Sequence, residues 1–504
     1  MRSLGRVLVA NRGEIAVRIL RGCREAGLPT AAVFSAADAD ACHVRAAERA
    51  LEIGSGPARE SYLAADRILD AARRLDAGSV HPGYGFLAEN AAFAEAVMRA
   101  NLVWIGPPPA AIRAMGEKTA ARRAMQAAGV PVVPGTLEAV TDSRAALDAA
   151  AEARYPILLK AAAGGGGKGM RVVREAAEVE SAFAAASREA QGAFGDPALY
   201  VERYIPEARH IEIQILADES GRAIHLGERE CSLQRRHQKV LEECPAPGIA
   251  HETRERMGAV AVRAAEAVGY VGAGTVEFLL APDDTFWFLE MNTRLQVEHP
   301  VTEMVTGIDL VRAQLAIAAG GPLPLEQDRL RLSGHAIECR IAAEDPARGF
   351  VPSTGRISAY AEPAGPGIRV DSGIAAGSAV TAHYDPLLLK VIAHGRDRPE
   401  ALARMGRALA ELDIGGVRTN VGFQRALVAH GAVRQGRFHT RWLEENAGDV
   451  LEAEAAMRRD SEPLAAALAA WIQAERPPVS AARGQAAANG RARWRQTARW
   501  TGLP

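Results

Sequence analysis

A group of polar side chains follows directly on an apolar run near residue 290. Phe286 to Leu289 predict a buried strand, and the chain then continues EMNTRLQVEH. These polar groups cost free energy to desolvate unless a partner compensates them. The segment therefore predicts a site for charged ligands, formed by Glu290, Asn292, Arg294, Gln296, Glu298 and His299.

Two carboxylates and an amide here have the types and spacing of a divalent-cation site. Glu277 in GTVEFLLA and Glu290 in FLEMN belong to two expected neighbouring strands, joined over APDD. If the strands pair in register, both carboxylates face the same side of the sheet, and Asn292 at i+2 shares that face. Such oxygen ligands suit Mg²⁺ or Mn²⁺ between nucleotide phosphates. The alternative is two solvated glutamates on a sheet surface.

A guanidinium and a carboxylate continue the same spacing. Arg294 could hold a small planar anion through two parallel hydrogen bonds, and Glu298 could act as a base on that anion. On spacing alone, a structural Arg–Glu pair is an equally good interpretation. The charged segment 227–247 offers Lys239 and His237 as a positive pocket for anionic intermediates, or else a solvated surface.

A glycine loop, LLKAAAGGGGKGMRVV at 158–173, predicts phosphate binding, since glycines let backbone N–H groups converge on an anion. The Walker A pattern fails because Gly169 follows Lys168. The dinucleotide fingerprint requires a helix, whereas a strand, MRVV, follows. A loop between two strands of a lid over nucleotide phosphates fits best, and a hairpin with no ligand is the alternative.

Composition argues against several classes of partner. The 504 residues carry a formal net charge of −1, so no general attraction to nucleic acid or to anionic membranes is expected. No apolar run approaches the roughly 18 residues that span a bilayer, and the N-terminus does not resemble a signal peptide. Scattered cysteines without a C-x-x-C pair predict free thiols and a cytoplasmic location. Arginine dominates the basic residues, and the lysines are Lys118, Lys160, Lys168, Lys239 and Lys390.

Apolar periodicity divides the chain into several regions. Residues 6–34 read as strand, glycine turn, helix and strand, which predicts a parallel sheet covered by helices up to about residue 109. A helix is expected around 115–130, and a small insert of strands and a helix over 131–203. From residue 204 the pattern predicts a largely antiparallel sheet. After 446 the chain becomes rich in Ala, Pro and Arg, with a short helix at LAAALAAWIQA.

Eight motifs, taken together, resemble the biotin carboxylase family of the ATP-grasp superfamily. They are LVANRGEIAVRI, HPGYGFLAEN, MGEKTAA, AAAGGGGKGMRVV, VERYIPEARHIEIQI, CSLQRRHQKVLEECPAP, FLEMNTRLQVEHPVTE and HAIECRIAAEDP. They occur in the family's order between about residues 4 and 446. Departures are small: Ala162 and Ala163 precede the glycines, and Glu117 precedes Lys118 where aspartate is usual.

The resemblance implies a fold of α/β and α+β type. Its parts would be a Rossmann-like pre-ATP-grasp domain (1–115), an ATP-grasp domain (116–334) with a mobile lid (131–203), a biotin carboxylase C-terminal domain (335–446) and a linker or docking tail (447–504).

The resemblance also implies roles for individual residues. ATP would contact Lys118, Lys160, Gly166, Gly167, Glu202, Arg203, Tyr204, Ile205, His210 and His237. Two Mg²⁺ or Mn²⁺ ions would be held by Glu277, Glu290 and Asn292. Bicarbonate would be held by Lys239, Arg294, Gln296 and the Val297 backbone, with Glu298 as its general base. Biotin would contact Arg340, Tyr84 and Gly85.

The implied activity is that of an ATP-dependent ligase that carboxylates biotin through carboxyphosphate. No A-M-K-M-like motif is present, so the biotin is expected on a carrier protein or on a further domain. A carboxyltransferase subunit and a homodimer or larger complex are also implied. Two alternatives remain: another ATP-grasp ligase, such as a carbamoyl-phosphate-forming enzyme, and a non-catalytic nucleotide-sensing subunit.

Overall fold

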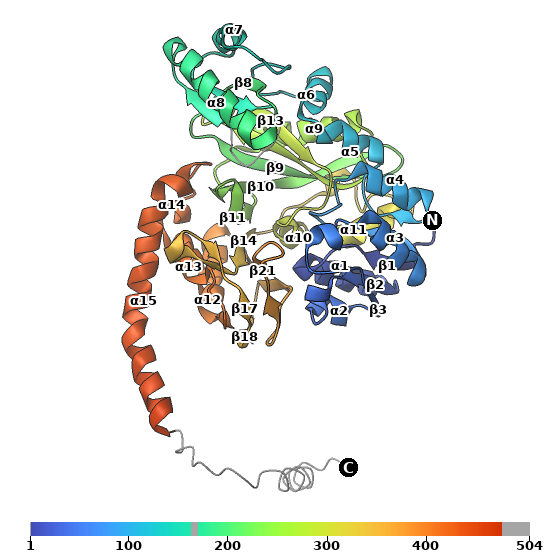
Figure 1. The fold of residues 1–504 in the computed structure, drawn as a ribbon, viewed down its shortest axis with the longest axis vertical. Coiled ribbons are helices and arrows are strands. Elements are labelled where there is room, and N and C mark those ends of the chain that lie inside the picture. Colours follow the sequence, from blue (N-terminus) through green and yellow to red (C-terminus); the bar gives the residue numbers. More distant parts are fainter. Residues whose placement is uncertain (1, 163–169, 476–504) are drawn as a thin grey trace. The chain divides into compact units, whose positions relative to one another are not determined.

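The computed structural model describes residues 2–162 and 170–475, except the side chains of Lys118 and of residues 460–475. The chain divides into two compact units, Met1–Glu454 and Ala455–Pro504. Figure 1 colours the elements along the sequence. The residues expected to form the site all belong to the first unit.

A parallel five-stranded sheet begins the chain, in the order β3-β2-β1-β4-β5. The expected strand, turn, helix and strand at 6–34 are β1, α1 and β2, and Gly27 follows the helix with a φ of 71°. The strands are β1 (Arg6–Val9), β2 (Thr30–Phe34), β3 (Arg49–Glu52), β4 (Ala77–His81) and β5 (Val103–Trp104). The helices are α1 (Gly13–Glu25), α2 (Cys42–Ala46), α3 (Ala65–Arg74) and α4 (Ala91–Arg99), the last capped by the Asn90 side chain, which accepts from the backbone N–H of Phe93.

A small three-stranded antiparallel sheet, in the order β7-β6-β8, carries two helices. Its elements are β6 (Ile157–Ala161), β7 (Met170–Val173), β8 (Leu199–Arg203), α7 (Ser143–Ala153) and α8 (Val179–Phe194). An apolar core of its own joins these elements, with Phe183 and Leu159 among its members. The glycines between β6 and β7 lie outside the described residues, but the strands on either side are those expected.

An eight-stranded sheet, in the order β13-β12-β9-β10-β11-β14-β21-β19, forms the centre of the unit. All its described pairings are antiparallel, as expected after residue 204. Because β14, which begins at residue 335, pairs with β11, the sheet contains strands from both sides of the domain boundary expected between residues 334 and 335. The strands are β9 (Arg209–Ala217), β10 (Ala223–Arg235), β11 (Gln238–Cys244), β12 (Gly272–Leu280), β13 (Phe286–Asn292), β14 (His335–Ala342), β19 (Ile368–Ser372) and β21 (Leu387–Gly395).

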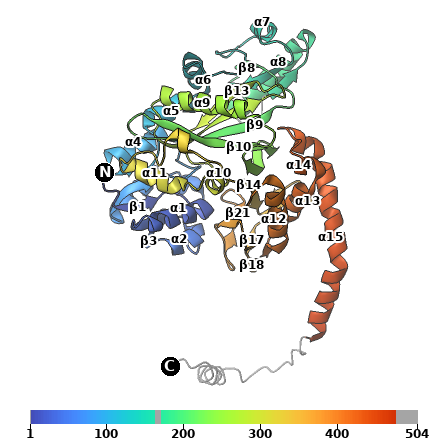
Figure 2. The same cartoon turned by 180° about the vertical axis from the view of Figure 1, so that it is seen from behind.

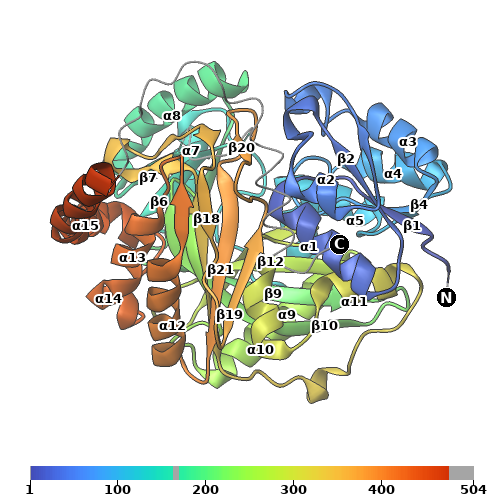
Figure 3. The same ribbon diagram turned by 90° about the horizontal axis from the view of Figure 1, so that it is seen from below.

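Helices cover this sheet and join it to the parallel domain. Helix α9 packs against β9 and β10 (Figure 2), and α1 packs against β19 (Figure 3). The helix expected around 115–130 is α6, which begins later than expected because Glu117, with φ −99° and ψ 116°, separates it from α5. The helices are α5 (Pro109–Gly116), α6 (Lys118–Ala127), α9 (His251–Ala267), α10 (His299–Thr306) and α11 (Leu310–Ala318).

The remaining elements follow β14, and among them α12 packs against β14 and β21 of the sheet. The strands are β15 (Glu344–Asp345), β16 (Val351–Pro352), β17 (Gly355–Arg356), β18 (Ala359–Ala361), β20 (Ala379–Val380) and β22 (Asp413–Gly415). The helices are α12 (Arg398–Glu411), α13 (Val421–Ala429), α14 (Gly431–Arg434) and α15 (Trp442–Glu475). Helix α15 is longer than the short helix that the sequence predicts.

Two expectations from composition can be compared with the described residues. The five cysteines are free thiols, and Cys42 is the one among them that is not buried. Within the described ranges, the helices are all too short or too polar to cross a bilayer.

Candidate functional site

The carboxylates that predict a cation site occupy opposite positions on two paired strands. Glu277 of β12 lies across from Glu290 of β13, and Thr275 lies across from Asn292. The register on which the sequence interpretation depends is therefore present. Glu277 and Asn292 are buried, whereas Glu290 is exposed.

These residues line a cavity of about 430 Å³ at the side of the large sheet. Most of the cavity wall comes from β9 to β14 and the segment 293–298 that joins β13 to α10, and the rest from Glu344, Phe350, residues 385–387 and Asn420. Residues expected from sequence that line it are His210, His237, Lys239, Glu277, Glu290, Asn292, Arg294, Gln296, Val297, Glu298 and Arg340. The residues expected to bind cations, to bind the anion and to act as base thus line one cavity.

A two-residue turn positions Lys239 at the edge of the cavity. β10 ends at Arg235 and β11 begins at Gln238, so Arg236 and His237 form the turn, with φ of 50° and 64°. Positive φ at both positions matches the twist of a hairpin, but Gly and Asn are the usual residues there. Non-glycine residues held in this conformation often occur at functional sites.

The Lys239 ammonium contacts three buried carboxylates. Its Nζ lies 2.5 Å from Glu212, 3.0 Å from Glu277 and 2.5 Å from Glu298. Burial alone would lower the pKa of Lys239, but these carboxylates raise it well above its usual value. Lys239 is therefore a permanent cation around which three negative charges can approach one another.

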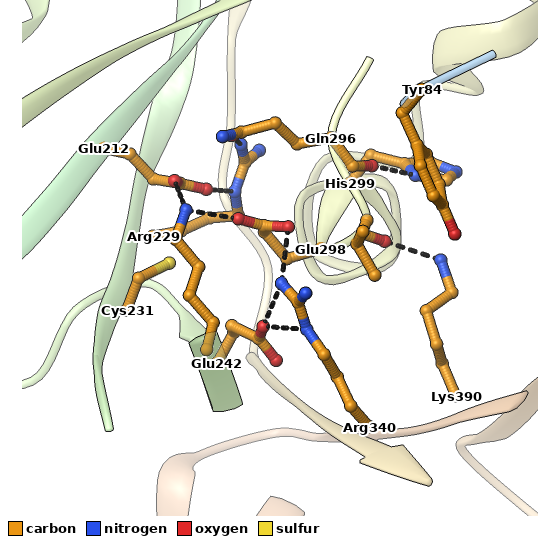
Figure 4. A network of polar contacts seen from close by, with 12 residues as sticks. Tyr84, Glu212, Arg229, Cys231, Glu242, Gln296, Glu298, His299, Arg340 and Lys390 are labelled. Carbon is orange, nitrogen blue, oxygen red and sulfur yellow. Dashed lines mark hydrogen bonds and ion pairs between the residues drawn. The ribbon is translucent and has the colours of Figure 1, made fainter. Parts of the chain in front are cut away.

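Glu298 lies between two cations. One of its oxygens accepts from Lys239, and the other accepts from Arg340 Nη2 at 2.8 Å. Burial by itself would raise the pKa of Glu298, but Lys239, Arg340 and Arg229 lower it below its usual range. The carboxylate is therefore ionised; Figure 4 shows its contacts, and Glu298 is one of the residues that line the cavity. An ionised carboxylate at this position can accept a proton from a bound anion.

Arg340 connects Glu298 to a pair of carboxyl groups that face each other across two strands. Its Nε donates to Glu242 at 2.5 Å, and Glu242 of β11 lies opposite Glu338 of β14. Burial raises the pKa of Glu242 to about 7, although Arg340 favours its ionised form. Burial raises the pKa of Glu338 well above its usual value, and Glu242 adds to this shift. Glu338 is therefore the carboxyl that retains its proton.

Arg294 is held by a residue of the parallel domain. Its Nε donates to Glu89 at 2.9 Å, and its Nη2 donates to Asn292 at 2.9 Å. Glu89 also accepts from the backbone N–H of Thr293. The sequence analysis did not identify Glu89 as a site residue. The available signal was a charged residue within the motif HPGYGFLAEN, directly before Asn90, which caps α4.

A buried guanidinium below the cavity was also missed. Arg229 is fully buried and contacts Glu212, and it donates to Gln296 at 2.9 Å (Figure 4). It further donates to Gln214, Thr302 and Thr275. The available signal lay in its partners: Glu212 and Gln214 are polar residues in the otherwise apolar strand HIEIQI. Arg229 itself was overlooked because the many charges of segment 227–247 suggested a solvated surface.

Of the residues expected around ATP, His210 and His237 line the cavity, and the other described ones lie on or after β6 and β8. Lys160 of β6 and Glu202 of β8 form an ion pair at 3.6 Å, and Arg122 also contacts Glu202 at 2.6 Å. Arg203, Tyr204 and Ile205 follow on and after β8, and none of these lines the 430 Å³ cavity. Gly166, Gly167 and the Lys118 side chain lie outside the described residues.

The two residues expected beside biotin follow β4. The hydroxyl of Tyr84 donates to Glu14 of α1, and its carbonyl accepts from Asn11 at 2.7 Å. Gly85 is exposed with a φ of 69°, a conformation that favours glycine. Neither lines the cavity itself, but Figure 4 shows Tyr84 near the segment that carries Gln296 and Glu298.

Three family models match successive parts of the chain. The model described as "Biotin carboxylase, N-terminal domain" matches residues 3–112. The model described as "Carbamoyl-phosphate synthase L chain, ATP binding domain" matches residues 117–326. The model described as "Biotin carboxylase C-terminal domain" matches residues 338–445. Together they cover most of the chain in the order that the motifs predict.

Known proteins and structures resemble the chain over most of its length. Biotin carboxylase 1 of Bacillus subtilis (strain 168) is 50% identical over 440 residues, which are 87% of this chain and 98% of that protein. The mitochondrial methylcrotonoyl-CoA carboxylase subunit alpha of Oryza sativa subsp. japonica is 48% identical over 480 residues, which are 94% of this chain and 65% of that protein. The biotin carboxylase domain dimer of Hydrogenobacter thermophilus 2-oxoglutarate carboxylase, solved with MgADP, ADP and bicarbonate, is 44% identical with a TM-score of 0.84, covering 89% of this chain and 99% of that chain.

The protonated state of Glu338 predicts how stability depends on pH. Its folded-state pKa lies above the usual value of 4.5, so the stabilisation from its bound proton is complete below that value and is lost as the pH rises. Glu338→Gln cannot ionise and avoids this loss. We expect the variant to gain stability relative to the native chain as the pH rises from 5 to 8. The full gain is about 1.4 kcal/mol for each unit by which folding raises the pKa of Glu338.

Urea unfolding at several pH values measures this difference. Glu266→Gln, at an exposed position on α9, is the matched control and should show a difference that does not vary with pH. A constant difference between Glu338→Gln and the native chain from pH 5 to 8 would show that Glu338 is ionised in the folded state.

Proposed function

The chain belongs to the biotin carboxylase family of ATP-dependent ligases, and from the geometry of its cavity we propose how it works. It uses ATP and bicarbonate to carboxylate N1 of biotin on a separate carrier. One observation carries the proposal: a base, two anion-binding cations and a set of hard oxygen ligands line a single cavity. These are Glu298, Lys239, Arg294, Glu277, Glu290 and Asn292.

The oxygen ligands fit a magnesium site. Glu277 and Glu290 lie opposite each other in register, and Asn292 follows two residues later on the same strand. Two carboxylates and an amide oxygen form a donor set that Mg²⁺ or Mn²⁺ prefers over softer metals. Two such ions bound there would neutralise charge on the phosphates of ATP.

Residues of the small sheet and its surroundings are proposed to bind the nucleotide. The phosphates would contact Lys118, Lys160, Gly166 and Gly167, with His210 and His237 nearby. The adenine would lie along Glu202, Arg203, Tyr204 and Ile205. The ion pair of Lys160 with Glu202 supports a shared role, since it brings the proposed phosphate and adenine contacts to adjacent strands.

Bicarbonate activation is the first chemical step. Lys239, Arg294, Gln296 and the Val297 backbone would hold the anion, while the ionised Glu298 accepts its proton. A bicarbonate oxygen forms a bond to the γ-phosphorus of ATP, and ADP leaves, which gives carboxyphosphate. Because charge grows on phosphoryl and carboxyl oxygens, the fixed cations at the cavity wall stabilise this step most.

Carboxyl transfer to biotin is the second step. Carboxyphosphate breaks into CO₂ and phosphate, the phosphate takes the N1 proton of biotin, and N1 then attacks CO₂. Arg340 would stabilise the negative charge on the ureido oxygen, and Tyr84 and Gly85 would border the ring. Arg340 contacts Glu298 at 2.8 Å, so the same guanidinium serves the base of the first step and the substrate of the second.

The proposed partners follow from this chemistry. Biotin would be presented by a biotin carboxyl carrier protein or domain, and a carboxyltransferase subunit would take the carboxyl group onward. We further propose a cytoplasmic homodimer or larger complex, divided into domains at 1–115, 116–334, 335–446 and 447–504 with a lid at 131–203. The similarity to a protein named as subunit alpha of a carboxylase supports a multi-subunit assembly.

Substitution of Glu298 tests its role as the base. Glu298→Gln keeps the shape of the side chain but cannot accept a proton, so bicarbonate-dependent ATP cleavage should fall about hundredfold or more. The KM for ATP should stay within about twofold, since the proposed base does not bind the nucleotide. Release of phosphate with and without bicarbonate and free biotin measures the effect, and the exposed Glu326→Gln serves as the control.

Two outcomes would contradict this account. A native chain whose ATP cleavage requires neither bicarbonate nor biotin would sink the proposed function. Full bicarbonate-dependent activity in Glu298→Gln would instead remove Glu298 from its role while leaving the function in place.

Substitution of Glu290 tests the metal site. Glu290→Gln removes one charged ligand from an exposed position, so it should raise the Mg²⁺ concentration for half-maximal ATP cleavage several-fold with little change in thermal stability. Titration with Mg²⁺ and separately with Mn²⁺, at constant ionic strength and fixed ATP, measures the requirement. An unchanged requirement for both ions would show that Glu290 is not a ligand.

A further inference from the structure

A fully buried lysine lies beneath the cavity without a role in the proposed reaction. Lys390 of β21 is 0% exposed and is one of the largest completely buried side chains of the first unit. Burying an ammonium costs several kcal/mol unless neighbouring groups compensate it. Because the basic residues of this chain are nearly all arginine, a lysine at this buried position indicates that its ammonium has a specific partner.

The partner is the segment that carries the base. The Nζ of Lys390 donates to the carbonyl of Val297 at 2.5 Å. Figure 4 shows Lys390 directed at this segment from the opposite side to Arg229. The carbonyl of Val297 and the N–H of Glu298 belong to one planar peptide unit. A hydrogen bond that fixes the carbonyl therefore fixes the start of the residue that acts as base.

The strands beneath the segment fix Lys390 in turn. Within the sheet, Lys390 lies opposite Arg340 of β14 on one side and opposite Asp371 of β19 on the other. Opposite residues of paired strands project to the same face of a sheet. Lys390, which binds the Val297 carbonyl, and Arg340, which contacts Glu298, are therefore adjacent residues on the same face of the sheet.

Charges from every packed element determine the state of Lys390. Glu14 of α1 lies 3.5 Å from its Nζ, and Asp371 lies 3.9 Å away. Glu338, Arg369 and His299 also face it from β14, β19 and α10. Burial would lower the pKa of Lys390, but Glu14 and Asp371 raise it above its usual value despite Arg369. The amine is therefore a cation.

The same contacts reach the residue expected beside biotin. Glu14 accepts from the hydroxyl of Tyr84 and lies next to Lys390. Lys390 is thus connected on one side to the bicarbonate segment and, through Glu14, to Tyr84 on the other. Three regions distant in sequence meet at a single ammonium group.

We propose that Lys390 is a positioning residue for bicarbonate activation, which holds the Val297–Glu298 peptide so that the base and the backbone face the bound anion. The inference rests on the proposed function. Lys390 does not touch bicarbonate in this arrangement and acts through the segment it anchors. Its loss should therefore change the kinetics of bicarbonate and leave those of ATP alone.

Lys390→Met tests this because it keeps the length of the side chain and removes the donor. We expect the kcat of bicarbonate-dependent ATP cleavage to fall at least tenfold and the KM for bicarbonate to rise several-fold, with the KM for ATP within twofold of the native value. A purely structural role would instead lower the amount of folded protein and leave the constants of the folded fraction unchanged.

Two further variants keep the test decisive. Lys390→Met with Glu14→Gln removes one cation and one anion together, so it avoids an unpaired buried carboxylate if the single variant does not fold. Arg398→Met is the matched control: it breaks the buried ion pair of Arg398 with Glu243, on α12 and β11. The control should lower the melting temperature with bicarbonate constants unchanged.

The outcomes separate this inference from the proposed function. A native chain without bicarbonate-dependent ATP cleavage would overturn the proposed function. Native activity together with a folded Lys390→Met, or folded double variant, that keeps the native kcat and KM for bicarbonate would overturn the role of Lys390 alone. A selective loss on the bicarbonate side in either variant, absent from Arg398→Met, would support it.

Discussion

The site depends on keeping one enclosed carboxylate charged. Glu298 is nearly inaccessible to solvent, and a buried ionised carboxylate is strongly destabilising without partners. Lys239 and Arg340 supply one partner for each of its oxygens. Those two cations would themselves be unfavourable in the interior, and they are balanced by the carboxylates of Glu212 and Glu242. The ionised state of Glu298 therefore depends on an alternating set of charges, and removing one member leaves a buried charged partner without its full compensation.

Antiparallel strands give this set its geometry. Successive pairs face each other across the ladder: Glu277 with Glu290, and Glu242 with Glu338. The segment 293–298 has no ladder of its own, and it is held from three directions. Glu89 of the parallel domain holds Arg294, Arg229 of β10 holds Gln296, and Lys390 of β21 holds the Val297 carbonyl. These three contacts fix the positions of the side chains on segment 293–298, although the segment itself is not part of the sheet.

Periodicity and local motifs were enough to predict much of this arrangement. Spacing at i and i+2 anticipated the shared face of Glu290 and Asn292, and the motif order anticipated the family. Contacts between distant segments were beyond such reasoning. Glu89 and Lys390 act on residues about 200 and 90 positions away, and no local pattern specifies which strands become neighbours. The helix expected near 115–130 is present, but its start was misplaced for a different reason: the backbone at Glu117 is extended, which the sequence pattern does not indicate.

The balance of charge also explains why the cavity suits a reaction with cations and polyphosphate. The cavity lining already holds carboxyl groups in about the same number as cations: Glu277, Glu290, Glu298, Glu344 and Asp385 beside Arg235, Lys239, Arg294 and Arg340. Bound ATP and bicarbonate would add further negative charge to the same space. Protein cations alone therefore cannot neutralise a loaded site, and divalent ions at Glu277 and Glu290 are the species that would restore the balance. The metal dependence that we propose is thus consistent with the electrostatics of the folded chain as well as with the chemistry of phosphoryl transfer.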